Sequence, residues 1–496
     1  MFKYEYLKSK TIIVLFSLSF FFSFIIFPDP TTENKIISSL FKNFHLSRIE
    51  FRFLYLLTFL FLIYDYFFSK KINKKAIIFS ILIPLSIFIY STIFFLFKFS
   101  DFSDFSDFFD IIRLEETQKF IIKIFIQCIV IGLSILIIYF YQNFLIKNLS
   151  KIIDFYICIF VTLIIIFEIF HFGILFDTLF RCDLGFFYTT KYLFKENSHF
   201  AIISAPILVF FIYNIKNYLK KKFFLILYLL FLFFCFGNFN LTFFLSIISS
   251  IIIISITCRN IPKISKYLFF LLIIISCTIF LIERSENSCM SKIDSISEKY
   301  GLNSKADTFV GKIQSPKIKF TSIFDNNNQN LSTSVFIYSY YVAKKSLFEN
   351  PLGVGINNYK NYREIFDKSL EVDRTSVEAI ARGDYPKIKF KEKYMPKMNY
   401  LITELNKNSG STNFSKLVTE FGFISLLILF IIFVYSFSNK LDDNIKVFFI
   451  PLIFIQTFIR GTGYFNSGFL ISLIIVLMII LTFFIQKYEN NKPTKI

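Results

Sequence analysis

The chain has 496 residues, of which 55% are hydrophobic and 75 are phenylalanine, and its formal net charge is +19 at pH 7. This composition excludes an ordinary soluble globular protein, because the apolar fraction is far above the usual range. Long apolar runs, each able to cross a hydrocarbon core about 30 Å thick as a helix, instead predict an all-α integral membrane protein.

Twelve apolar runs are predicted to cross the membrane. In chain order they are 11–27, 51–68, 76–97, 120–146, 152–170, 199–215, 223–236, 240–257, 267–283, 414–438, 447–459 and 467–486. No small-residue cleavage site follows the first run, so we expect a retained helix and not a signal peptide. The predicted organisation is therefore nine spans in 1–283, one large loop in 284–413, and three spans with a tail in 414–496.

Lysine and arginine in the short loops predict which side each loop faces. The amino-terminal segment, the basic loops around 70–75 and 216–222, and the tail all fall on one side, which we expect to be cytoplasmic. In this topology 13 of the 14 glycines and all three histidines lie in loops or at helix ends of the other side. We therefore expect any active site to face outward. We expect no nucleic acid partner.

Cysteine and histidine spacing predicts no metal centre. Five of the seven cysteines lie in or beside predicted spans, where they act as small apolar residues. Cys182 and Cys289 lie in outer loops, and both a disulfide between them and two free thiols remain open. No spacing is typical of a zinc site, so we expect neither a metal nor another cofactor.

The large loop contains a predicted amphipathic helix followed by a glycine turn. SVFIYSYYVAKKSLF (334–348) has aromatic residues on one side and should lie on the membrane surface until Asn350-Pro351 ends it. The next residues, LGVGINNY, lack the third glycine and the GK[ST] of nucleotide-binding loops. Gly353 and Gly355 are therefore predicted to form an architectural turn, and Asn357, Asn358 and Tyr359 are candidates for contact with a sugar.

Several stretches carry a resemblance to a known family. NPLGVGINNY followed by STNFSKLVTEFGFISLLILF (411–430) is similar to the central pattern of the O-antigen polymerase and ligase superfamily. FKENSHFAI (194–202) and FIRGTGYF (458–465) resemble E-P-S-H-F-A and R-G-x-G-Y-F segments of its polymerase (Wzy-type) branch. Asn197 stands where the family often has proline, and the histidine of ligases, expected near Asn413, is absent. The missing histidine counts against a ligase, and the two polymerase-type stretches favour a polymerase, whereas Asn197 departs from the family pattern.

The resemblance implies a GT-C-like membrane glycosyltransferase of the bacterial inner membrane, with a periplasmic active site. It would transfer a growing glycan from undecaprenyl diphosphate to the non-reducing-end hydroxyl of another lipid-linked repeat unit. Implied partners are this lipid-linked oligosaccharide, membrane lipid, a chain-length regulator and a flippase. The alternatives are a ligase that moves glycan to lipid A core or protein, and a flippase or transporter. Predicted intramembrane charges near helix ends favour an enzyme over a transporter.

Such a reaction needs cations for the diphosphate and a base for the sugar hydroxyl. Arg460, the sole charge in a glycine-containing turn, is the first candidate cation, with a snorkelling arginine as the alternative. Glu196 and His199 share a helical face and are the candidate catalytic pair, unless Glu196 only stabilises a helix amino terminus. Further candidates for binding diphosphate or sugar are Arg181, Lys191, Arg374, Arg382, Glu420, Asn357 and Tyr464.

Overall fold

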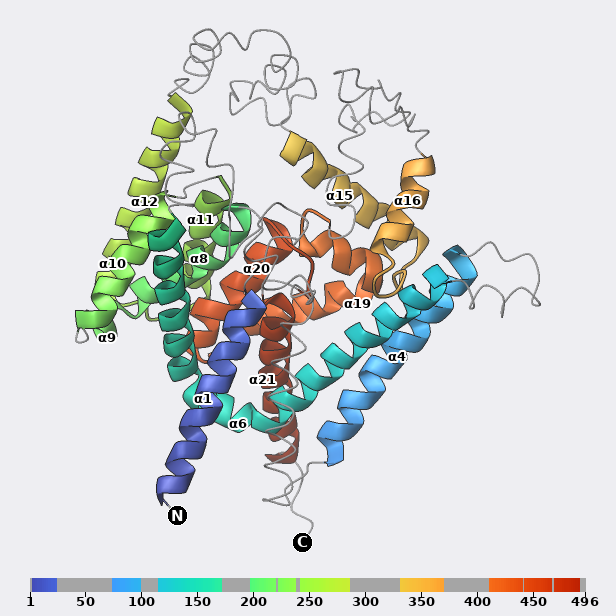
Figure 1. The fold of residues 1–496 in the computed structure, drawn as a ribbon, viewed down its shortest axis with the longest axis horizontal. Coiled ribbons are helices and arrows are strands. Elements are labelled where there is room, and N and C mark those ends of the chain that lie inside the picture. The colour runs from blue at the N-terminus through green and yellow to red at the C-terminus, as the bar shows by residue number, and fades with distance from the viewer. Residues whose placement is uncertain are drawn as a thin grey trace.

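A computed structural model of the protein describes residues 2–24, 74–99, 115–171, 197–219, 222–237, 241–285, 331–369, 410–439, 441–465 and 468–490. Every regular element within these ranges is a helix (Figure 1). Three stretches are long and apolar enough to cross a membrane: Ile77–Leu96, Thr117–Leu163 and Asn413–Ser436. The described part of the chain is therefore all-helical, with the features of a membrane protein.

The predicted spans are helical wherever they fall on described residues, and further helices lie between them. In chain order the helices are α1 (Phe2–Phe24), α4 (Lys74–Phe99), α6 (Glu115–His171), α8 (Asn197–Tyr213), α9 (Ile215–Leu219), α10 (Lys222–Gly237), α11 (Leu241–Thr257), α12 (Lys263–Ser285), α15 (Leu331–Glu349), α16 (Tyr359–Ser369), α19 (Asn413–Ser436), the π-helix η2 (Ile445–Phe449), α20 (Ile450–Phe458) and α21 (Phe469–Asn490). The predicted span 51–68 lies outside the described residues. The expected twelve crossings and the GT-C-like architecture remain predictions.

Helix α6 differs from the sequence prediction. The runs 120–146 and 152–170 were expected to be separate spans, but the structure has one 57-residue helix over both. In Figure 1 this helix bends into two arms, one beside α4 and the other beside α1, that meet at the bottom of the view. The predicted break, KNLSK at 147–151, contains neither glycine nor proline, so the backbone can remain helical through the bend.

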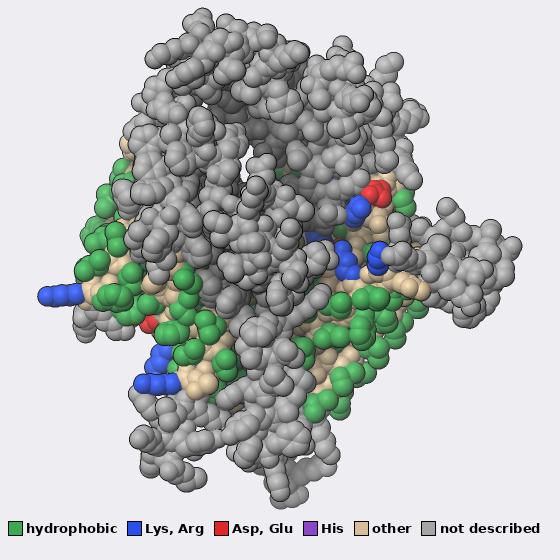
Figure 2. Space-filling model, viewed as in Figure 1, with side chains coloured by type: hydrophobic (Ala, Val, Ile, Leu, Met, Phe, Trp, Pro, Cys, Tyr) green, Lys and Arg blue, Asp and Glu red, His purple; other side chains and the backbone are tan. Residues whose placement is uncertain are grey.

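The outer face of α4 is apolar. Ile81, Leu82 and Ile93 are each about half exposed, at 56%, 53% and 49%. In Figure 2 apolar side chains form a patch over this part of the molecule, and lysine and arginine side chains lie above it, toward α15 and α16. Exposed apolar patches of this kind mark a membrane or partner surface. Contact with lipid explains the α4 face, given the length and composition of this helix.

The centre of the protein is built around α8, η2 and α20. The Phe448 ring packs edge-on against Tyr156 of α6 at 6.0 Å and Phe210 of α8 at 5.7 Å between ring centroids. All three side chains are completely buried. Such close packing fixes the orientation of the helices that it joins. It therefore fixes η2, from which α20 continues, against α6 and α8.

Candidate functional site

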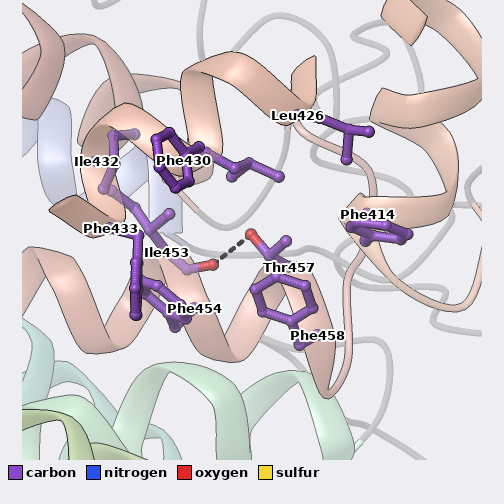
Figure 3. A pocket seen from close by; sticks show the side chains of 10 residues that line it. Phe414, Leu426, Phe430, Ile432, Phe433, Ile453, Phe454, Thr457 and Phe458 are labelled. Carbon is purple, nitrogen blue, oxygen red and sulfur yellow. Dashed lines mark hydrogen bonds between the residues drawn. The ribbon is translucent and has the colours of Figure 1, made fainter. Parts of the chain in front are cut away.

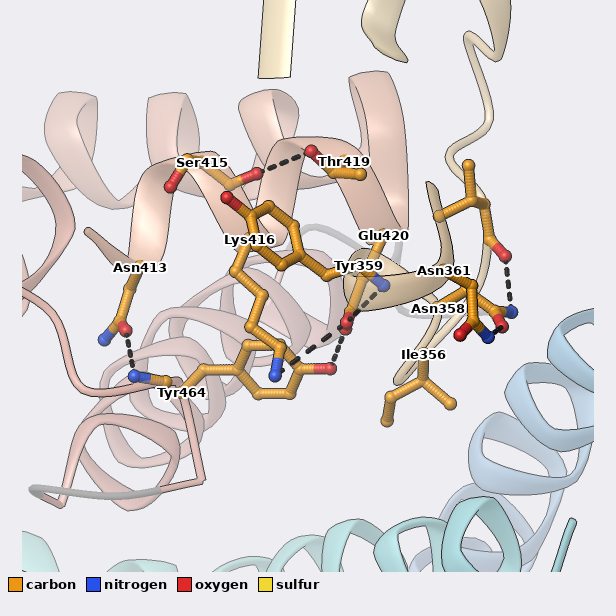
Figure 4. Close-up of polar contacts among 12 residues, drawn as sticks. Ile356, Asn358, Tyr359, Asn361, Asn413, Ser415, Lys416, Thr419, Glu420 and Tyr464 are labelled. Carbon is orange, nitrogen blue, oxygen red and sulfur yellow. Dashed lines mark hydrogen bonds and ion pairs between the residues drawn. The ribbon is translucent and has the colours of Figure 1, made fainter. Parts of the chain in front are cut away.

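Three stretches that carry the family resemblance lie in contact with one another (Figure 4). They are the loop 350–358 after α15, the first turns of α19, and the turn 459–465 between α20 and α21. Glu420 contacts Tyr359, 61 residues away, and Tyr464, 44 residues away. We call Glu420, Lys416, Tyr464, Tyr359 and Asn413 the Glu420 cluster. Local sequence preferences do not bring such distant segments together, so the tertiary fold creates this cluster.

Helix α19 is broken at Gly422, and the loop 350–358 docks at the break. The Gly422 backbone has φ +54° and ψ −136°, a conformation that side chains other than glycine avoid. A Cβ atom at this position would overlap the Pro351 carbonyl oxygen. The Phe423 N–H donates to that same oxygen at 2.9 Å instead of continuing the helical hydrogen bonds. Gly422 is thus required both for its backbone conformation and for the close approach of the loop.

The break also frees two carbonyl groups that the loop then satisfies. The N–H groups of Val354 and Gly355 donate to the carbonyl oxygens of Thr419 and Glu420, each at 2.9 Å. Buried carbonyl groups need such donors, and an unbroken helix would have supplied them itself. The predicted architectural turn is present, with φ +86° at Gly353 and Gly355. The Val354 and Gly355 N–H groups of this turn replace the helical hydrogen-bond donors that α19 lacks at its break.

Helix α4 holds the other side of the loop. The Ser91 hydroxyl oxygen accepts a hydrogen bond from the Ile356 N–H at 2.8 Å, and the Tyr90 hydroxyl donates to the Gly353 carbonyl at 2.7 Å. The Asn358 side-chain amide donates to the Ser91 carbonyl at 3.3 Å. The loop is therefore clamped between α4 and α19, and its conformation depends on both helices.

The Glu420 carboxylate lies at the centre of the cluster and is completely buried. One oxygen accepts from the Tyr464 hydroxyl, and the other accepts from the Tyr359 N–H at 3.3 Å. The Asn357 N–H also bonds to this carboxylate, and the Lys416 ammonium lies 3.9 Å from it. A buried carboxylate needs such partners to remain charged. Because they occupy its oxygens, Glu420 is suited to fixing the loop and not to contacting a sugar.

Tyr464 is also buried and lies within the turn 459–465. Burial and the adjacent Glu420 carboxylate raise the pKa of the Tyr464 phenol well above its ordinary value. The Lys416 ammonium lies 5.2 Å from the centre of the Tyr464 ring, within cation–π range. The phenol therefore remains protonated at neutral pH and acts as a hydrogen-bond donor.

The turn 459–465 packs on the amino terminus of α19. The Gly461 N–H donates to the Ser411 carbonyl, and the Gly463 N–H donates to the Asn413 side-chain oxygen, each at 3.0 Å. Thr412 caps the helix by accepting from the Ser415 N–H at 3.3 Å. The amide nitrogen of Asn413 is buried and has no hydrogen-bond partner among the described residues. This nitrogen is a donor beside the positive end of the α19 dipole.

Some predicted site residues lie in or beside this cluster. Glu420 and Tyr464 belong to it, and Asn357 lies in the loop with the left-handed φ of +67° that asparagine tolerates. Arg460 lies in the turn and is partly buried. Its backbone N–H donates to the Ile455 carbonyl at 3.1 Å. The sequence therefore pointed to several parts of one site without indicating that they meet.

His199 is the further predicted residue that lies within the described part of the chain. His199 lies in the first turn of α8, is only 6% exposed, and is carried by a helix that packs on α11, α20 and η2. The predicted residues outside the described part of the chain are Arg181, Cys182, Lys191, Glu196, Cys289, Arg374 and Arg382.

Lys416 and Asn413 were not among the predicted site residues, whereas Tyr359 was a candidate for contact with a sugar and instead donates its N–H to Glu420. A signal for Lys416 was present, because it precedes Glu420 by four positions and the two side chains share a helical face. No comparable signal links Asn413 to Gly463 or Tyr359 to Glu420, because those contacts join distant segments.

No protein-family model, curated protein or solved structure matches this chain. The described residues define an all-helical membrane protein with a buried polar cluster where three segments meet.

Proposed function

We propose that the protein is an O-antigen or related surface-polysaccharide polymerase, an inner-membrane glycosyltransferase of lipopolysaccharide biosynthesis. One observation carries the proposal. NPLGVGINNY, STNFSKLVTEFG and FIRGTGYF each resemble the family, and the three stretches pack against one another around Glu420. Short motifs that match a family by chance have no reason to meet in space, so their contact supports a common site.

In the proposed reaction, the bond between the growing glycan and the diphosphate of undecaprenyl diphosphate breaks. A new bond forms from the same sugar carbon to the non-reducing-end hydroxyl of a second lipid-linked repeat unit. Undecaprenyl diphosphate leaves, and the hydroxyl proton passes to a base. Because the donor carries its own leaving group, this chemistry requires no nucleotide.

Several predicted residues, and the Glu420 cluster, have a role in this proposal. Arg460 neutralises the negative charge of the leaving diphosphate, for which a permanently protonated guanidinium is suited. His199, with Glu196, takes the proton of the acceptor hydroxyl. The Glu420 cluster is a set of positioning residues, because it fixes the turn that carries Arg460 against the loop 350–358. In the proposed topology Arg460 and the Glu196–His199 pair face the periplasm. A chain-length regulator and a flippase are the proposed partners.

Lipopolysaccharide banding tests the proposal. A strain lacking this protein should attach a single repeat unit to its core, and the wild-type gene should restore the ladder of longer chains. Arg460→Ala should fail to restore the ladder at equal membrane abundance. Arg259→Ala removes an exposed arginine from the segment between α11 and α12 and is the matched control, which should restore the ladder.

Other outcomes would contradict the polymerase proposal. A deletion strain with no repeat unit on its core would require ligation or flipping instead. An unchanged ladder would remove O-antigen polymerisation as the function, and full activity of Arg460→Ala would remove Arg460 from the diphosphate site.

A further inference from the structure

A groove with a volume of about 360 Å³ lies between α19 and α20. Its lining residues are Phe414, Leu426, Leu429, Phe430, Ile432, Phe433, Ile453, Phe454, Thr457 and Phe458 (Figure 3). The single polar side chain, Thr457, donates its hydroxyl to the Ile453 carbonyl at 2.6 Å. The lining therefore presents hydrocarbon, and the groove suits an apolar occupant.

The groove faces the surroundings of the protein and not its packed centre. Phe430, Phe433 and Phe458 line it and are 62%, 46% and 40% exposed. They lie on α19, which is long and apolar enough to cross a membrane, and on the neighbouring α20. A lipid chain can therefore reach the groove directly from the bilayer.

Aromatic rings follow the length of the groove. Ring centroids are 5.5 Å apart for Phe414 and Phe458, 5.7 Å for Phe458 and Phe454, and 6.0 Å for Phe454 and Phe433. Tyr340 of α15 continues this row by stacking on Phe414 at 5.3 Å. A row of rings along the groove fits a linear hydrocarbon chain better than a compact ligand.

One end of the groove adjoins groups that favour an anion. Phe414 follows Asn413, whose buried amide nitrogen is a donor at the positive end of α19. Phe458 is the last residue of α20, and Ile459 and Arg460 follow it in the chain. An apolar groove whose lining residues Phe414 and Phe458 are followed or preceded in the chain by Arg460 and the amino terminus of α19 is complementary to a lipid with one hydrocarbon tail and an anionic head.

We infer that this groove holds the isoprenoid tail of the lipid-linked donor, with the diphosphate at the end formed by Asn413 and Arg460. The inference rests on the proposed function, which supplies an isoprenoid lipid in preference to a diacyl phospholipid. It adds a binding site for the tail, and it means that residues of α19 and α20 determine which lipid is bound.

Two neighbouring leucines give a matched test. Leu426 lines the groove, whereas Leu427 is 59% exposed and does not. Leu426→Trp should fill the groove, and Leu427→Trp adds the same side chain on the same helix outside it. Purified full-length protein in nanodiscs would be irradiated with a polyprenyl phosphate that carries a diazirine in its tail, and the labelled peptides would be identified by mass spectrometry.

We expect labelling within α19 and α20, reduced about tenfold by Leu426→Trp, equivalent to 1.4 kcal/mol of binding free energy, and unchanged by Leu427→Trp. Leu429→Trp, at a second lining position, replaces Leu426→Trp if that variant does not fold. Equal labelling of both variants, or labelling confined to other helices, would overturn the inference. The inference would also be overturned if phosphatidylglycerol displaced the probe as effectively as unlabelled polyprenyl phosphate does.

This binding experiment is independent of glycan synthesis. If Leu426→Trp blocks labelling while the deletion strain keeps a normal ladder, the groove binds an isoprenoid lipid and the polymerase proposal fails. If the ladder depends on the protein but the groove is never labelled, the polymerase proposal stands and the tail lies elsewhere.

Discussion

The Tyr464 hydroxyl donates a hydrogen bond to the Glu420 carboxylate, and this contact joins the turn 459–465 to α19. Both side chains are buried, at 2% and 0% exposure. Water cannot replace a lost partner at such a site, so the stability of the protein should depend on each donor to the carboxylate.

Tyr464→Phe should therefore destabilise the protein. It removes one donor from a buried carboxylate, which costs about 1–3 kcal/mol. Thermal unfolding can be followed with a thiol-reactive dye, because Cys128 and Cys235 are buried free thiols that react once the protein unfolds. Tyr267→Phe, at a residue that is 76% exposed, is the control and should leave the midpoint unchanged. Equal midpoints for Tyr464→Phe and wild type would argue against this hydrogen bond.

Lys416 and Glu420 should show energetic coupling. Lys416→Met leaves the carboxylate without its neighbouring cation, and Glu420→Gln leaves the ammonium without its anion, so each single change should destabilise the protein. The double variant removes both charges and should be more stable than the sum of the two changes predicts, by about 1–2 kcal/mol. Unfolding midpoints of the four proteins complete the cycle. Additive effects would mean that the 3.9 Å ion pair does not contribute.

Gly422→Ala should destabilise α19, although alanine is normally the better helix former by about 1 kcal/mol. The reason is the positive φ at this position, which costs about 1–3 kcal/mol for alanine, together with overlap of the new methyl group and the Pro351 carbonyl. Leu427→Ala, at an exposed position of the same helix, is the control. The sign of the change in unfolding midpoint decides the matter, because stabilisation would mean that α19 is continuous.

The hydrogen bond from Tyr362 to Glu349 should make the protein less stable at alkaline pH. Its hydroxyl donates to the Glu349 carboxylate at 2.6 Å, and burial followed by that carboxylate raises the pKa of the phenol. In the unfolded chain the phenol ionises near its ordinary pKa of about 10, whereas in the folded protein it remains protonated. Its contribution is therefore complete below about pH 10 and is lost as pH rises further, by at most about 1.4 kcal/mol per pH unit.

Circular dichroism at pH 8 and pH 11 measures this effect. Tyr362→Phe should be less stable than wild type at pH 8, because it lacks the hydrogen bond, and should lose less stability on going to pH 11. Tyr267→Phe should follow the wild type. Identical pH dependence of wild type and Tyr362→Phe would exclude a contribution from Tyr362.

Much of the helical content could be predicted from apolar runs, and the turn at Gly353 and Gly355 from its glycines. The loop expected between 120–146 and 152–170 is helical instead, because two lysines indicate a loop without preventing a helix. The break at Gly422 was not predicted either. A single glycine within an apolar run does not reveal that Pro351, 71 positions earlier, will approach it.

The candidate site shows the same limit. Glu420, Asn357 and Tyr464 could be named from their motifs, and Lys416 from its spacing to Glu420. The hydrogen bonds that join them cross between separate segments and follow from how α4, α19 and α20 pack. Sequence patterns indicate which residue types are unusual for their surroundings, and tertiary packing decides which of them become neighbours.

The position of Tyr464 along the chain also bears on biogenesis. Translation produces the loop 350–358 first, then α19 with Glu420, and only afterwards the turn that carries the phenol. Until that turn arrives, the carboxylate lacks one of its donors and needs hydration, so it must remain at the aqueous boundary. Closure of the polar cluster is therefore a late step, which awaits the insertion of α20.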